Sequence, residues 1–174
     1  GELRDPISET ARADLICFTR CPQGQKAAQA ELPAGVPVVH AAYRSQSLLP
    51  LGGGEALAPE SLKGERVAAF AGIARPVDFL QQVEAIEAEV VHFQAFPDHH
   101  AYTGEECEAF ARAAGSRGAK FILVSEKDSV KLSAGSFSLP VFALAVEMEF
   151  LEGDPLLTRY LLGPLASREE KPVA

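Results

Sequence analysis

The densest group of ionisable side chains in the sequence is Asp98-His99-His100. Histidine is the side chain whose charge changes nearest to neutral pH, so an imidazole beside a carboxylate can act as a general base. An ordinary turn is the alternative interpretation, with Asp98 capping the following segment and both imidazoles in solvent. Metal binding is disfavoured, because adjacent residues point in different directions and no third and fourth ligand follows at regular spacing. The other two histidines, His40 and His92, lie in apolar, strand-like runs and are interpreted as structural.

A second group, Ser125-Glu126-Lys127-Asp128, directly follows an apolar run and opens a predicted helix. Backbone N–H groups at such a helix start, together with the Lys127 amine, could meet a phosphate. The alternative is a capped helix whose Glu126, Lys127 and Asp128 form a solvated face. Arg75 follows another apolar run and could clamp an anion, although an arginine exposed on a loop is the commoner case.

One pattern is absent from the printed sequence. Nowhere does it contain Gly-x-x-x-x-Gly-Lys-[Ser/Thr], the loop whose backbone cradles nucleotide phosphates, and Gly115-Ser116-Arg117-Gly118 does not match it. If the reaction involves a nucleotide, the phosphate cradle must come from elsewhere.

The elements that position these groups alternate in type from Val67 onward. Short apolar runs alternate with segments of helical period, which is the pattern of βαβ units and a parallel sheet. Thr103-x-x-Glu106 matches a capping box and predicts where one helix begins. Strands are expected at 67–71, 90–93, 121–124 and 140–150, and helices at 76–87, after Thr103 to Gly115, and from Ser125 through Leu132.

Three polar loops leave the carboxyl ends of these strands, at residues 72–75, 97–102 and 125–128. The carboxyl ends of parallel strands share one edge of a sheet, and ligands bind in the crevice there. The side chains that could converge there from distant parts of the sequence are Arg75, Asp98, His99, His100, Glu126, Lys127 and Asp128.

The remaining segments are less regular. Strands are expected at 15–19 and 36–43, helices at 25–32 and 155–162, a loop from Gly52 to Lys63, and a polar tail at 167–174. The predicted division is a linker and domain start at 1–66, an α/β core at 67–150, and a terminal helix and tail at 151–174.

The composition sets further limits. The 174 residues carry 16 Lys and Arg against 24 Asp and Glu, for a formal charge of −8. This length and an apolar fraction of 47% predict one globular domain rather than a disordered chain or a coiled coil. Because nucleic-acid binding needs a basic stripe that no segment supplies, nucleic acid is not expected as a partner.

The three cysteines, none in a Cys-x-x-Cys pair, indicate a reducing compartment. No apolar run reaches the roughly twenty residues that a membrane span needs, and residues 1–15 lack the apolar core of a signal peptide. The sequence therefore predicts a cytoplasmic protein. It opens at Gly1 as if in the middle of a longer chain.

Taken together, these segments resemble a known family. Val67–Pro76, Phe96–Tyr102 and Ser125–Lys131 are similar, in order and spacing, to the carboxyl-terminal half of the tetraacyldisaccharide 4'-kinases, the lipid A 4'-kinases of Gram-negative bacteria. The opening Gly1–Pro6 and Arg12-Ala13-Asp14 also resemble the family, with Asp5 in place of the usual Glu. The resemblance covers residue 1 to about residue 150.

The resemblance implies a kinase that uses ATP and Mg²⁺ to phosphorylate the 4'-hydroxyl of tetraacyldisaccharide 1-phosphate, giving lipid IVA. It implies two α/β/α domains joined by a β linker, with the P-loop and metal-binding acids in the amino-terminal one. This chain then corresponds to the second domain, a three-layer α/β/α sandwich with a mostly parallel sheet, with 36–43 and 141–150 as linker strands. We expect such a chain to be inactive alone and to hold no metal. The intact enzyme is expected at the cytoplasmic face of the inner membrane, with membrane contact made through the other domain.

The resemblance also implies roles for individual residues. His99 matches the first histidine of the family's Asp-His motif, which pairs with an aspartate of the other domain in a catalytic dyad near the γ-phosphate. Asp98 is its neighbour and a supporting residue. Ser125–Asp128 matches the family's Thr-Glu-Lys-Asp, with serine preserving the capping hydroxyl, so Glu126, Lys127 and Asp128, with Arg75, are candidates for support or substrate binding.

Two rival interpretations remain. Asp-His-His is also the motif of one family of metal-dependent phosphoesterases, but that family needs further Asp motifs to hold two metals, and none is found here. The other rival is a non-catalytic α/β module whose polar edge binds a nucleotide or a partner. In that case, changing His99 would alter an affinity and no rate.

Overall fold

The structure is a computed structural model that describes residues 6–21, 32, 35–152, 157–160 and 163. The chain forms two compact units, one of residues 1–43 and 148–174 and the other of residues 44–147. Within the described residues, no helix combines the length and apolar character needed to cross a bilayer.

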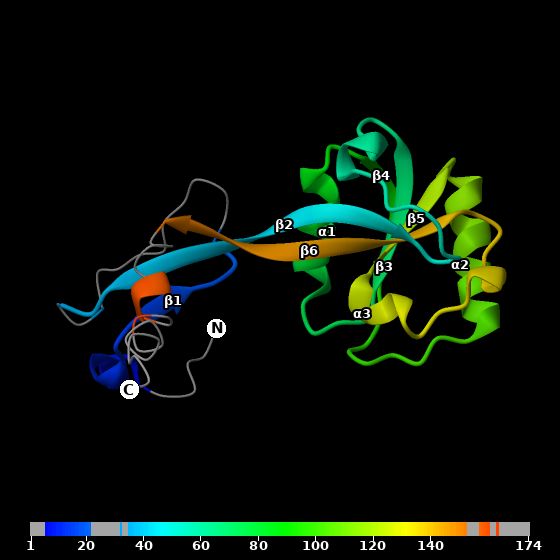
Figure 1. Cartoon of the computed structure of the whole chain (residues 1–174). Coiled ribbons are helices and arrows are strands. Elements are labelled where there is room, and N and C mark those ends of the chain that lie inside the picture. The colour runs from blue at the N-terminus through cyan, green and yellow to red at the C-terminus, as the bar shows by residue number, and fades with distance from the viewer. Residues whose placement is uncertain (1–5, 22–31, 33–34, 153–156, 161–162, 164–174) are drawn as a thin grey trace, which may run out of the picture. The chain divides into compact units, whose positions relative to one another are not determined.

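The second unit is built on parallel strands. β3 (Arg66–Ala71) pairs in parallel with β4 (Glu89–Ala95) and with β5 (Phe121–Ser125), and β5 pairs in parallel with β6 (Val141–Glu152). The full strand order is β1-β2-β6-β5-β3-β4. Because β2 (Val38–Pro50) and β6 run side by side in opposite directions (Figure 1), the sheet is mixed but mostly parallel, which confirms the predicted fold class.

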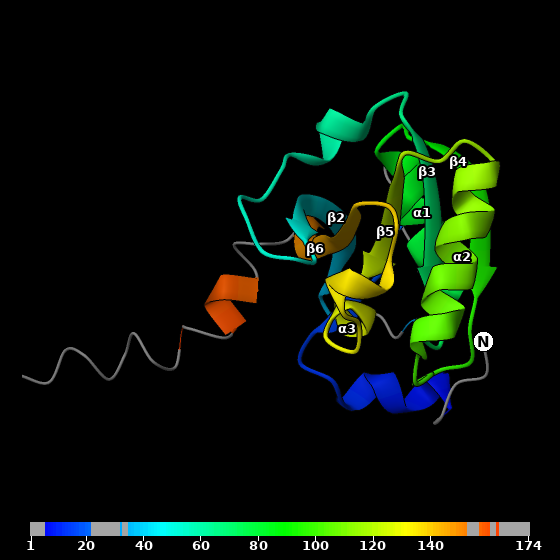
Figure 2. The ribbon, with the colours of Figure 1, turned by 90° about the vertical axis from the view of Figure 1, so that its right-hand side faces the viewer.

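Helices cover the two faces of this part of the sheet. Phe79 and Val83 of α1 (Pro76–Ala85) pack into one apolar cluster with Val67, Ala69 and Ala71 of β3. Phe110, Ala111 and Ala114 of α2 (Gly104–Ser116) pack into a second cluster with Ala68 and Phe70. Since alternate residues of a strand point to opposite faces, β3 supplies both clusters. Figures 1 and 2 show α1 and α2 on opposite sides of β3, β4 and β5, so this unit has the predicted three α/β/α layers.

Local sequence signals account for where the two long helices begin. Pro76 occupies the first helical turn of α1, where its missing N–H costs nothing. At α2 the Thr103 hydroxyl accepts the Glu106 N–H at 3.2 Å, and the Glu106 carboxylate accepts the Thr103 N–H at 2.9 Å, which confirms the capping box. α1 ends at Ala85, two residues before the predicted position at Glu87, which has a left-handed φ of 59°.

The prediction of a helix through Leu132 is wrong in length. α3 (Glu126–Ser129) is a single turn capped by the Ser125 hydroxyl, which accepts the Asp128 N–H. The Lys131 and Leu132 N–H groups then bond to the carbonyls three residues earlier, so a tighter turn replaces the helix. Three short 3₁₀ segments were also not predicted, η1 (Ile7–Arg12), η2 (Pro59–Leu62) and η3 (Ala134–Ser136).

The first unit contains β1 (Ile16–Phe18), which pairs in parallel with the start of β2. Both predicted strands of this region therefore exist, although β2 continues to Pro50 rather than ending at Tyr43. His40 is buried and its ring stacks on Phe18 at 5.6 Å between centroids. The predicted helix at 25–32 lies almost entirely outside the described residues, as does the polar tail, and of the predicted last helix residues 157–160 are helical.

Candidate active site

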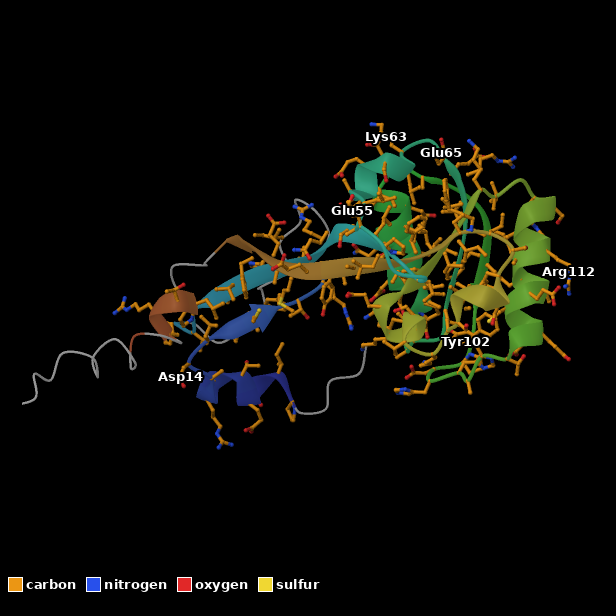
Figure 3. All side chains as sticks on the ribbon, turned by 45° about the vertical axis from the view of Figure 1, so that its right-hand side comes forward. Asp14, Glu55, Lys63, Glu65, Tyr102 and Arg112 are labelled. Carbon is orange, nitrogen blue, oxygen red and sulfur yellow. The ribbon has the colours of Figure 1, made fainter. Side chains whose placement is uncertain are left out.

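The three polar loops meet at the carboxyl edge of the parallel strands, as predicted, and Gly72 joins them. Its N–H donates to Oδ2 of Asp128 at 3.0 Å, and its carbonyl accepts the N–H of His99 at 3.1 Å. In Figure 3 Tyr102, from the loop after β4, lies at this edge near α3, and Lys63 and Glu65 lie at the opposite end of the second unit. Residues from three separate segments are thus tied together at one point.

The loop after β4 turns sharply at His99. The His100 N–H bonds to the Pro97 carbonyl at 3.1 Å, and His99 adopts a left-handed φ of 60°. Such a conformation is uncommon for residues other than glycine, although histidine tolerates it better than most. The Asp98 carboxylate accepts the His99 N–H at 3.1 Å, and its other oxygen lies 3.8 Å from His99 Nε2. The His99 side chain is 90% exposed, so the turn presents a solvent-exposed imidazole beside the Asp98 carboxylate.

The adjacent His100 has the opposite surroundings. Its side chain is 21% exposed, and Nε2 lies 3.2 Å from Oε1 of Glu106. Its ring stacks on Phe96 and meets the edge of Tyr102, with centroids 4.8 and 4.9 Å away. Hydrogen bonds from Thr103, and then the His100 contact, hold the pKa of Glu106 below its usual value. The turn interpretation is therefore wrong for one of the two imidazoles, because His100 is packed rather than solvated.

The aromatic side chains of this loop anchor it to β3. Phe70, which is fully buried, contacts Phe96 and Tyr102 at centroid distances of 5.7 and 5.2 Å. On its other sides Phe70 meets Phe110 and Phe137. The loop that carries His99 is thus held by packing on both flanks of the turn.

The loop after β5 places its carboxylate inside the protein. Asp128 has no exposed surface, and its Oδ2 accepts a 2.6 Å hydrogen bond from the Ser125 hydroxyl as well as the one from Gly72. The Lys131 amine lies 3.2 Å from Oδ1. Ser125 caps the helix as predicted, but the expected solvated face is limited to Glu126 and Lys127. Asp128 is in a position to support the loops rather than to touch a ligand.

The remaining candidates lie on the surface. The Glu126 carboxylate accepts the Val146 N–H at 3.3 Å, and Lys127 is exposed. The Arg75 guanidinium pairs with Asp78 in the first turn of α1, with 3.0 Å between Nε and Oδ2. Asp78 thus holds one edge of the Arg75 guanidinium, and an anion would have to bind through the remaining N–H groups. Among the described residues, no hydrogen bond or ion pair joins Arg75, Glu126 or Lys127 to His99.

Sequence reasoning placed Gly72 and Tyr102 in the loops but gave neither a role. A Cβ on Gly72 would lie 2.6 Å from the Tyr102 hydroxyl oxygen and 3.2 Å from the Pro97 carbonyl oxygen, so the packing requires glycine here. Burial, and then the neighbouring Asp128 carboxylate, raise the pKa of Tyr102. The available signal was a glycine directly after a buried strand, a common mark of close backbone approach.

Two further features lie between β4 and α2. A depression of about 220 Å³ between β4 and α2 is lined by Gln94, Phe96, Glu106, Ala109, Phe110 and Ala113. His92, on β4, stacks on Phe110 at 5.0 Å, and burial followed by the nearby Arg117 charge lowers its pKa. Among the residues described by the structure, no three His, Cys, Asp or Glu side chains gather in a way that could hold a metal ion.

Comparison with known proteins settles the family. The sequence model of the family described as tetraacyldisaccharide-1-P 4'-kinase matches residues 1–165. The chain belongs to the tetraacyldisaccharide 4'-kinase family. It is 37% identical over 155 residues to a tetraacyldisaccharide 4'-kinase of Pelobacter propionicus, and 35% identical over 179 residues to one of Anaeromyxobacter sp. strain K. Membership confirms the resemblance drawn from the three loop motifs.

The same comparisons show how much of these kinases the chain represents. The aligned regions cover 89% and 96% of this chain but 42% and 47% of the two relatives. A crystal structure of the LpxK protein from Aquifex aeolicus in complex with ATP matches with a TM-score of 0.57 and 26% identity, covering 90% of this chain and 44% of that one. The chain therefore spans less than half the length of the kinases that it matches.

Proposed function

We propose that this chain is the carboxyl-terminal domain of a kinase that transfers the γ-phosphoryl group of ATP to the 4'-hydroxyl of tetraacyldisaccharide 1-phosphate, giving lipid IVA in lipid A synthesis. Family membership supports the reaction class. The share of the relatives that the chain covers supports its being one of two domains.

One observation carries the proposed role of this domain. The main chain of His99 is fixed by bonds to Gly72 and Asp98, whereas its imidazole is 90% exposed at the carboxyl edge. A side chain held by its backbone and projecting from the protein is arranged to act on something outside this domain. We propose that this is the reacting centre, completed when the amino-terminal domain closes over it.

In that centre His99 is the catalytic residue, with Asp98 supporting it. Phosphoryl transfer depends mainly on positioning and charge stabilisation, and on a group that orients the attacking hydroxyl. An unprotonated imidazole nitrogen can accept the hydroxyl proton, and an aspartate of the other domain would orient the ring through its second nitrogen. Asp98 supports the ring through the backbone, because its carboxylate accepts the His99 N–H at 3.1 Å and its other oxygen lies 3.8 Å from Nε2.

The nucleotide and its metal are assigned to the other domain. The described residues do not form a magnesium site, and the printed sequence has no phosphate-cradling loop. We propose that ATP and Mg²⁺ are held mainly by the other domain, and we expect the isolated chain to transfer no phosphate. Lys127 and Arg75 are proposed to meet substrate phosphate groups from the rim. The proposal also places the intact enzyme at the cytoplasmic face of the inner membrane, where a tetraacylated lipid is available, with the membrane contact made by the other domain.

The test is transfer of labelled γ-phosphate from ATP to tetraacyldisaccharide 1-phosphate by the full-length protein, amino-terminal half included. His99→Asn is the sharpest variant, because asparagine tolerates the left-handed conformation and removes only the imidazole. We expect the rate to fall by at least about 100-fold, as for loss of a general base. Glu84→Gln, an exposed change on α1, is the matched control and should leave the rate unchanged.

Two results would contradict the proposal. A near-normal rate for His99→Asn would remove His99 from the mechanism. Binding of ATP or lipid with no transfer by the unmodified full-length protein would favour the non-catalytic binding module.

A further inference from the structure

The one carboxylate among the buried side chains of the described residues is that of Asp128; the other polar members of that set are His40 and Ser125. Burying a charge is costly unless hydrogen bonds and an opposite charge compensate it. Asp128 has both, with the Gly72 N–H and the Ser125 hydroxyl on Oδ2 and the Lys131 amine on Oδ1. A fully satisfied carboxylate at this depth fixes the groups that donate to it.

The contact with Gly72 leads directly to the proposed catalytic residue. Gly72 donates its N–H to Asp128 and accepts the His99 N–H with its own carbonyl, at 3.0 and 3.1 Å. The two peptide units that flank the Gly72 Cα therefore connect the buried carboxylate to the turn. Because glycine lacks a side chain that would restrict its backbone, the bond to Asp128 contributes more to its orientation than it would for another residue.

The His99 turn needs such support. A non-glycine residue in the left-handed region costs free energy and persists where its surroundings determine the conformation. The supports of the His99 N–H are the Gly72 carbonyl and the Asp98 carboxylate, and the second of these belongs to an exposed side chain. The Gly72 carbonyl, held from inside the protein, is the more rigid of the two.

We propose that Asp128 is a positioning residue that acts through the Gly72 peptide to hold the His99 backbone in the turn that presents the imidazole. The effect of Asp128 on the rate rests on the proposed function of His99. Its effect on the turn does not. Lys131 neutralises the carboxylate from the partly exposed side, and its amine also lies 5.8 Å above the centre of the Tyr102 ring, so the same charge supports the loop after β4.

The first test is a double-mutant cycle in the full-length kinase. Asp128→Asn keeps the shape of the side chain but loses the charge and one of the acceptor oxygens. We expect it to lower kcat by about ten- to a hundredfold, the range that a small misplacement of a catalytic group can produce, with KM for ATP and for the lipid nearly unchanged. In a protein that already carries His99→Asn, the same change should lower kcat no further.

The cycle separates the two proposals. If His99→Asn alone leaves the rate intact, the proposed function fails. Suppose instead that His99→Asn abolishes most activity. If Asp128→Asn then lowers kcat of the His99→Asn protein by the same factor as in the parent protein, Asp128 acts elsewhere and the positioning proposal is wrong. A loss of kcat in the single variant that disappears in the double variant supports it.

The second test measures the turn itself by amide hydrogen exchange in the full-length protein. Asp128→Asn should speed exchange in peptides that contain Gly72 and His99, and leave α1 as protected as before. Unchanged protection at both sites would overturn the proposal. If Asp128→Asn does not fold, Ser125→Ala removes one of the donors to Oδ2 and is expected to show the same pattern with a smaller loss of kcat. Full additivity of Ser125→Ala with His99→Asn would then reject it.

Discussion

The loops after β4 and after β5 carry similar densities of ionisable residues but use them in opposite ways. The loop after β4 leaves His99 90% exposed, whereas the loop after β5 buries Asp128 completely. The difference follows from what each side chain bonds to. The Asp128 side chain accepts hydrogen bonds from the Gly72 N–H and the Ser125 hydroxyl. At His99 the hydrogen bond to the Gly72 carbonyl is made by the main chain instead.

This contrast shows how a reactive group and its support can be divided between neighbouring strands. In the proposed mechanism the exposed histidine meets a second domain, while hydrogen bonds to its main chain hold it in position. We propose that the buried Asp128 carboxylate helps to fix that position through its hydrogen bond to the Gly72 backbone. The hydrogen-bond partners of the backbone and of the side chain therefore indicate whether a charged loop residue reacts or supports. Its distance from the edge of the sheet does not.

The largest expected effect on stability comes from replacing an aspartate by alanine in each of the two loops, in separate variants. Asp128→Ala leaves the Gly72 N–H and the Lys131 amine without their buried partner and should lower the free energy of unfolding by about 3 kcal/mol. Asp98→Ala removes an exposed carboxylate whose donors remain in contact with water, so its cost should stay below about 1 kcal/mol. Urea unfolding of both variants measures the difference. Equal losses would mean that burial does not distinguish the two aspartates.

A smaller effect is expected from separating the loops at their junction. In Gly72→Ala the new Cβ would lie 2.6 Å from the Tyr102 hydroxyl and 3.2 Å from a backbone carbonyl, and this overpacking should cost about 2 kcal/mol. Gly115→Ala is the matched control, since a Cβ there meets nothing within 4 Å and alanine favours the helix. Thermal unfolding should therefore show Gly72→Ala melting lower than the parent and Gly115→Ala no lower. A Gly72→Ala protein as stable as the parent would show that the two loops can move apart freely.

The smallest effect appears only at alkaline pH. Burial and the Asp128 charge raise the pKa of Tyr102 in the folded state above its unfolded value of about 10. The folded state therefore holds this proton more tightly, so the contribution is complete below about pH 10 and is lost as the pH rises further. Tyr102→Phe, which removes the titrating hydroxyl, should flatten the fall in stability above about pH 10 relative to the parent protein. Parallel stability curves for the two proteins would exclude Tyr102 as the titrating group.

Much of the second unit could be predicted from local patterns. Apolar runs gave the strands, Pro76 and the Thr103 capping box gave the helix starts, and the βαβ order gave the edge at which the polar loops meet. These features depend on residues close in sequence or on a general rule of chain topology. The same kind of reasoning placed His99 on that edge.

The roles within the site could not be predicted in the same way. Whether His99 or His100 is exposed depends on the rings of Phe96 and Tyr102 and on Glu106, which reach His100 only after the loop has folded. The burial of Asp128 depends on a donor 56 residues away, the Gly72 N–H. The end of α3 was also missed, because the Ser125 cap predicts where a helix begins and contains no information about its length.

The second unit begins at Arg44 on β2 and ends at Glu147 on β6, two strands that are neighbours in the sheet. The Gln46 side chain donates a 2.8 Å hydrogen bond to the Glu147 carboxylate, so the entry and exit of this segment of the chain lie next to each other. A segment whose ends are adjacent can be replaced in one piece without stretching the chain on either side. Residues 44–147 can thus be exchanged between relatives as one segment. Such an exchange would transfer Gly72, His99 and Asp128 together.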